Sequence, residues 1–159
     1  MMVRLDDLHP EEAAGMRAAA SRFGYIDQEA TPWITPPALS ESTICLVTSA
    51  ALHRRDDVPF RFGDSGYRLI PDDIDPNDLV QSQVSVNFDR THYQRDMNVV
   101  LPIDRLHELR DAGEIGGVSP LHFSVQGASP DASTFEAAAA DMANRMKELG
   151  VDAAMLVPV

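Results

Sequence analysis

Two periodicities run along the chain. Apolar runs, either continuous or alternating with polar residues, predict strands at 43–48, 67–71, 79–89, 119–127 and 153–157. Apolar residues spaced three and four apart predict helices at 10–23, 102–113 and 133–149. Gly24 and Gly150 directly follow two of these helices and Gly113 ends the third, and glycine is the usual residue at a helix end.

Strands and helices alternate from residue 42 onward, which is typical of α/β proteins. We therefore expect a single α/β domain over 1–159, whose core at 42–159 is a mostly parallel, doubly wound, Rossmann-like sheet in three layers. Residues 1–41 are predicted to form an N-terminal helix and a proline-rich arm, which Trp33 anchors by packing. The helix that starts at Ser133 carries a capping box that ends at Glu136.

Charge and composition narrow the function classes. The formal net charge is −12, whereas nucleic-acid binding draws its affinity from a basic surface, so we expect no such partner. No apolar stretch approaches the length of a membrane span and no signal peptide is visible, so we expect a cytoplasmic protein. The single cysteine, Cys45, lies inside a predicted central strand, where burial makes it a small hydrophobe rather than a nucleophile.

Candidate site residues follow from one rule of open parallel sheets: ligands bind beyond the carboxyl ends of the strands. The polar residues in such positions are Thr48, Ser49, His53, Asn87, Asp89, Ser124, Gln126 and Gly127. They converge only if their strands are neighbours in one sheet. The segment 87–98, which also contains Asp96 and Asn98, is dense in groups that bind or titrate, although a polar surface loop explains the same composition.

Several familiar kinds of site are not indicated. The histidines and aspartates show no HExxH-like spacing, so we predict no metal, and a metal-dependent lyase or isomerase is kept as the weakest alternative. No G-x-S-x-G elbow follows a strand, and no G-x-G-x-x-G loop follows the strand at 43–48. The residues alone therefore support a binding domain without an evident nucleophile.

Five blocks of sequence carry a family resemblance: ICLVTSAALHRR, YRLIP, DLVQSQVSVNFDRTHYQRDMNVVLPIDRLHELRDAGEIG, HFSVQG and MKELGVDAAMLVPV. In this order they resemble the selenoprotein B subunit of glycine, sarcosine, betaine and D-proline reductases, especially its shorter bacterial members. The central block, with its DxNVVxPxDRLxEL pattern, is the most specific. The resemblance implies thiol redox chemistry with a dithiol/disulfide couple on a small amino-acid-like substrate, beside a partner reductase subunit or a thiol reductant.

In that family the strand equivalent to AAMLVPV leads into a redox-active selenocysteine or cysteine, which we therefore expect at position 160 of a longer protein. The resemblance then gives His53 and Asp89 catalytic roles, as proton donor and as acid/base or ammonium-binding group. It makes substrate-binding groups of Thr48, Ser49, Asn87, Asp96, Asn98 and Ser124. The chain without that redox residue is expected to bind but not turn over. The alternative is a non-catalytic binding or scaffold domain of the same fold, and a homodimer is a further expectation.

Overall fold

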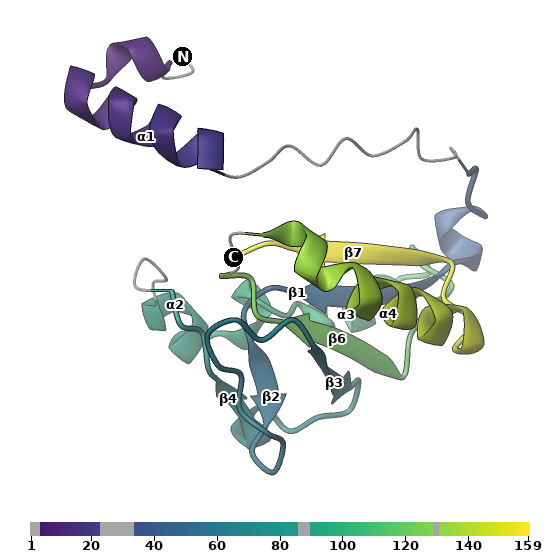
Figure 1. The fold of residues 1–159 in the computed structure, drawn as a ribbon. Helices are drawn as coiled ribbons and strands as arrows, with labels where there is room; N and C mark the ends of the chain where they lie inside the picture. Colours follow the sequence, from purple (N-terminus) through teal and green to yellow (C-terminus); the bar gives the residue numbers. More distant parts are fainter. Residues whose placement is uncertain (1–3, 23–33, 86–89, 129–130) are drawn as a thin grey trace.

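The computed structural model describes residues 4–22, 34–85, 90–128 and 131–159. Its strands are β1 (Thr43–Thr48), β2 (Leu52–Arg54), β3 (Tyr67–Pro71), β4 (Leu79–Gln81), β5 (Gly117–Val118), β6 (Leu121–Val125) and β7 (Ala153–Val157). Its helices are α1 (Pro10–Arg22), α2 (Arg90–Arg95), α3 (Ile103–Asp111) and α4 (Glu136–Glu148). Short 3-10 turns are η1 (Leu5–Asp7), η2 (Leu39–Glu41), η3 (Pro76–Asp78), η4 (Met97–Val99) and η5 (Ala132–Phe135). Helix α1 stands apart from the sheet-containing body of the protein (Figure 1).

Strand β1 is the centre of a five-stranded mixed sheet. It runs parallel to β7 from Ile44 to Thr48, and on its other side parallel to β5 and then to β6. Strand β3 pairs antiparallel with β6, while β2 and β4 form a separate antiparallel ribbon. The α/β class is thus confirmed. The predicted parallel, doubly wound, three-layer Rossmann-like sheet is not confirmed. Strand β3 runs antiparallel to its neighbour β6, and β2 and β4 lie outside the main sheet.

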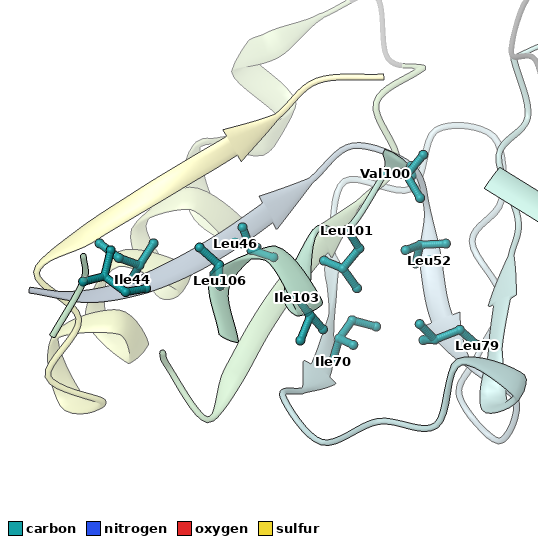
Figure 2. Packing of buried hydrophobic residues seen from close by; sticks show 11 residues of the cluster. Ile44, Leu46, Leu52, Ile70, Leu79, Val100, Leu101, Ile103 and Leu106 are labelled. Atoms are coloured by element: carbon teal, nitrogen blue, oxygen red, sulfur yellow. The ribbon is translucent and has the colours of Figure 1, made fainter. Parts of the chain in front are cut away.

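The apolar run TICLVT explains why β1 is central. Cys45 and Leu46 are completely buried, so consecutive residues of this strand are covered on opposite faces of the sheet. On one face, Ile44 and Leu46 join Ile103 and Leu106 of α3 in the main apolar cluster (Figure 2). Fully burying one such aliphatic side chain is worth about 1.5–3 kcal/mol.

The same cluster continues from the sheet to the β2–β4 ribbon. Ile70 of β3, Leu52 of β2 and Leu79 of β4 meet Val100 and Leu101, which immediately precede α3 (Figure 2). Leu52, Ile70 and Leu101 have no exposed surface. This packing holds the ribbon against the sheet although no β-ladder joins the two.

The predicted strand at 79–89 is wrong in length and in pairing. The strand observed there, β4, ends at Gln81, although the structure describes the chain to residue 85, and β4 pairs antiparallel with β2 instead of entering the parallel sheet. Alternating apolar residues indicate an extended segment with one covered face, but they do not select its partner strand. The carboxyl end of β4 is consequently not a parallel-sheet edge.

Helix α4 contacts the sheet where the Tyr67 hydroxyl of β3 donates to Asp141, and its half-buried residues include Met142 and Met146. The predicted capping box does not form. Instead the chain enters α4 through η5, whose N-cap Asp131 accepts a hydrogen bond from the backbone N–H of Ser133 at 3.0 Å. Among the described residues, no helix has both the length and the apolar character needed to cross a membrane.

Candidate functional site

The backbone after β1 makes the closest junction at the carboxyl edge of the sheet. The N–H of Ser49 donates to the carbonyl of Val157 in β7 at 3.2 Å, and the carbonyl of Ser49 accepts from the N–H of Gly127 at 3.2 Å. The Ser49 hydroxyl accepts from the N–H of Val159 at 2.9 Å. Ser49 therefore links the ends of β1, β6 and β7 by hydrogen bonds.

This junction is tight enough to restrict its residues. A Cβ atom on Gly127 would lie 2.7 Å from the Cβ of Ser49, so only glycine fits without movement. Ala51, in the same loop, has a φ of 55°, a left-handed conformation that costs an L-residue about 1–2 kcal/mol. Strained backbone of this kind persists where the surroundings fix it, and it concentrates at functional sites.

Two predicted residues meet in the strands that lead to this edge. Thr48 of β1 and Ser124 of β6 are register partners, and neither has exposed surface. The Thr48 hydroxyl accepts from the N–H of Ala50 at 3.2 Å. The Ser124 hydroxyl has no hydrogen-bond partner within the described part of the chain, which leaves a polar group in this buried layer able to accept one more bond.

Two glutamines connect this edge to the segment after β4. Gln83 donates through Nε2 to the carbonyl of Ser49 at 3.1 Å, and Gln126 donates through Nε2 to the carbonyl of Ser82 at 3.1 Å. Both side chains are almost fully buried. Ser82 and Gln83 were missed from the sequence because they were assigned to the interior of a long strand.

His53 lies in β2 and belongs to the same polar layer. Its Nδ1 is 2.7 Å from the carbonyl oxygen of Arg54 and its Nε2 is 2.8 Å from the hydroxyl of Ser82. The ring is 2% exposed and meets the Phe60 ring edge-on at 6.4 Å. A substrate at the carboxyl edge would therefore meet the Ser82 hydroxyl before it met the imidazole.

Asp96 and Asn98 lie at the turn η4, which precedes α3. Asp96 accepts from the backbone N–H and side-chain amide of Asn98 at 2.9 and 3.0 Å. Asn98 in turn accepts from the N–H of Asp104 at 3.1 Å. The side-chain and then the backbone bond from Asn98 hold the pKa of Asp96 below its ordinary value. Asp96 thus caps η4, Asn98 bonds the first turn of α3, and their predicted role in binding stays a prediction.

Asn87 and Asp89 lie outside the described residues, so their roles also remain predictions. Of the predicted set, the structure brings together Thr48, Ser49 and Ser124, with His53 reaching the same edge through Ser82.

A second polar cluster was not foreseen. The carboxylate of Asp72, just after β3, is hydrogen-bonded to Nε2 of His107 in α3 at 2.8 Å and to Nε2 of His122 in β6 at 3.1 Å. Nδ1 of His122 accepts the N–H of Leu46 at 3.1 Å, so the ring is held neutral with its proton on Nε2. Burial lowers the pKa of His122, although the bond to Asp72 opposes that shift. Asp72 lies 35 positions from His107 and 50 from His122 along the chain, so no local sequence pattern links the three residues.

Neither a metal centre nor a reactive thiol is found among the residues that the structure describes. No group of at least three His, Cys, Asp or Glu side chains there is arranged to hold a metal ion. Burial raises the pKa of the Cys45 thiol to about 12, despite a hydrogen bond from Ser119 that lowers it. Thiolates are the nucleophilic form of cysteine, so Cys45 is chemically inert in the folded protein.

A hollow of about 530 Å³ lies elsewhere, beside β3 and α4. Its lining includes Arg54, Arg68 and Arg145. Each of these arginines already contacts an aspartate within 3.2 Å, so the hollow offers no surplus of positive charge for an anion. The carboxyl edge remains the better candidate.

Comparison with known proteins gives two matches. The family described as glycine/sarcosine/betaine reductase selenoprotein B matches residues 37–159. The D-proline reductase subunit gamma of Acetoanaerobium sticklandii is 33% identical over 133 residues, which are 77% of this chain and 54% of that protein. The chain thus spans about half the length of this curated relative. No solved structure matches it significantly.

Proposed function

Because the chain belongs to the glycine/sarcosine/betaine reductase selenoprotein B family, as its resemblance indicated, we propose that it is a reductase subunit acting on a small amino-acid-like substrate. The substrate binds at the carboxyl edge of β1, β6 and β7. The observation that supports this location is the junction at Ser49, where three strand ends, a strained loop and a buried polar layer coincide.

In this proposal the redox-active selenocysteine or cysteine stands directly after Val159. The Ser49 hydroxyl, which binds the N–H of Val159 at 2.9 Å, would then hold the backbone next to the reactive atom. A selenolate or thiolate there attacks the substrate, and a dithiol couple restores it from the oxidised state. A reducing cytoplasm suits such chemistry, because it keeps these groups in their reactive form.

The remaining roles follow from position and chemistry. Thr48, Ser49 and Ser124 supply hydrogen bonds to the substrate, with Asn87, Asp96 and Asn98 on the facing loop. Asp89 binds the substrate ammonium group or acts as acid/base, and His53 is the proton donor of the site. A buried polar layer of this kind binds the polar groups of a substrate more tightly than an exposed surface does, because a buried donor or acceptor without a hydrogen bond costs free energy.

A partner fits the proposal as well. The relative is named as a subunit, and the family resemblance implies a partner reductase subunit or a thiol reductant. Strand β7 offers a surface for one: Met155 is 49% and Leu156 is 70% exposed on an uncharged strand. A partner subunit or a second copy would cover this surface.

The substrate site is tested by titrating the protein with glycine, sarcosine, betaine and D-proline while recording ¹H–¹⁵N NMR spectra. We expect saturable shifts for the amides of Ser49, Ser82 and Gly127 with one class of these compounds, and loss of those shifts in Thr48→Val. Thr43→Val, at the opposite end of β1, is the control and should leave them unchanged. Shifts confined to residues around Arg145 would move the site to the hollow beside α4.

A second test reads the codons that follow Val159 in the gene. An in-frame UGA or cysteine codon, followed by continuing coding sequence, supports the proposed redox residue. Any other codon at that place refutes it and leaves a non-catalytic binding or scaffold domain as the function.

A further inference from the structure

The Ser82 hydroxyl is hydrogen-bonded to the buried imidazole of His53. The second hydrogen bond of this ring, to the Arg54 carbonyl, determines which ring nitrogen carries the proton. The Arg54 carbonyl oxygen can only accept, and it lies 2.7 Å from Nδ1 of His53, so Nδ1 carries a proton. In the neutral ring Nε2 is then the acceptor. The Ser82 hydroxyl, 2.8 Å away, donates its proton to it. Hydroxyl, base and orienting acceptor thus stand in the order that activates a nucleophile.

The two residues differ in access. His53 is 2% exposed, while Ser82 is half-buried. The backbone of Ser82 is fixed on both sides, since its N–H donates to the carbonyl of Ala51 at 3.0 Å and its carbonyl accepts from Gln126 at 3.1 Å. The hydroxyl is therefore held between the imidazole and the carboxyl edge of the sheet.

We propose that Ser82 and His53 form a base-assisted hydroxyl whose ligands are small acyl or phosphoryl electrophiles. When such a compound reaches the edge, a bond forms from Oγ of Ser82 to the carbonyl carbon or phosphorus. The Oγ proton passes to Nε2 of His53, and the leaving group departs with its bonding electrons. The Arg54 carbonyl stabilises the imidazolium through Nδ1–H. This activity needs no thiol or selenol. It uses the neutral form of His53, whereas the proton-donor role in the reductase proposal uses the protonated form, so the two proposals are tested separately.

The test uses a fluorophosphonate probe, which forms an O–P bond with an activated serine and releases fluoride. Intact-mass and peptide mass spectrometry of the native protein should place the label on Ser82. Ser82→Ala should remove it. Ser85→Ala, a serine of the same segment, should label like the unaltered protein. His53→Gln should slow labelling of Ser82 by about 100-fold, the usual contribution of a general base.

Two further measurements separate loss of the base from loss of the fold. Circular dichroism and a thermal melt establish whether His53→Gln is folded, and urea-unfolded protein should not label. If that variant does not fold, ¹⁵N NMR of the imidazole decides instead, because the proposal requires the Nδ1–H tautomer with Nε2 as acceptor. Absence of label on native Ser82, labelling unaffected by His53→Gln in a folded variant, or the Nε2–H tautomer each overturns the proposal.

Discussion

We predict that His122 makes the stability of this protein depend on pH, because the hydrogen bonds of its ring are compatible only with the neutral form. Nδ1 accepts the N–H of Leu46 at 3.1 Å, and Nε2 donates to Asp72 at 3.1 Å, so a second proton on the ring would break the bond to the central strand. The side chain has no exposed surface. We therefore predict that His122 stays neutral in the folded protein at mildly acidic pH. The perturbation is His122→Asn, whose Oδ1 can still accept from Leu46.

The magnitude follows from proton linkage. Burial sets the pKa of native His122 below 6.5, whereas the unfolded chain titrates at about 6.5. The unfolded state therefore binds the extra proton, and stability falls as pH decreases below that value. If the native ring stays neutral, lowering the pH from about 7.5 to about 5.5 costs about 1.4 kcal/mol at this site. His122→Asn lacks this contribution.

The assay is urea unfolding of both proteins at the two pH values, followed by circular dichroism. The unaltered protein should lose about 1.4 kcal/mol more than His122→Asn between these conditions. Carboxylates act on both proteins alike and cancel in the difference. His9→Asn, which removes an exposed histidine near α1, should show the pH dependence of the unaltered protein. Equal pH dependence in His122→Asn and the unaltered protein would refute the neutral, doubly bonded ring.

Three other predictions concern the edge and the core. Iodoacetamide should not modify Cys45 in native protein at pH 8 but should modify it in urea, because burial holds the thiol pKa near 12; rapid modification of the native form would contradict its placement. Gly127→Ala should cost about 1–3 kcal/mol in urea unfolding, since its Cβ would overlap Ser49, while Gly15→Ala in open space should not destabilise. Asn98→Ala should lower the free energy of unfolding by about 1 kcal/mol, because the N–H of Asp104 in the first turn of α3 loses its acceptor. An unchanged urea midpoint would show that Asn98 does not stabilise this helix.

Local pattern was sufficient to predict most elements and to bring part of the candidate site to one edge of the sheet. The strands β1, β3, β6 and β7 were predicted from apolar runs, and α3 from its spacing, because burial on a sheet or helix face imposes a fixed period. The strand-end rule, which needs only the order of elements, predicted that Thr48, Ser49 and Ser124 meet at one edge of the sheet, and their roles in binding stay predictions.

What failed depends on contacts between segments remote in sequence. The partner of β4 is β2, across a connection that includes β3, and no period in LVQSQVSV reveals it. His122 is buried because Asp72 and Leu46 satisfy its two nitrogens, and neither is a neighbour in sequence. Ser82 belongs to the candidate site because the β2–β4 pairing brings Nε2 of His53 within hydrogen-bond distance of its hydroxyl.

The most direct measurement of the proposed function is substrate turnover by the protein extended past Val159 in its own reading frame. One form carries cysteine directly after Val159 and its control carries serine there. With a dithiol as electron donor and glycine, sarcosine, betaine or D-proline as substrate, we predict reduced product from the cysteine form alone. Product formation that is equal in the two forms would contradict a redox residue at the end of β7.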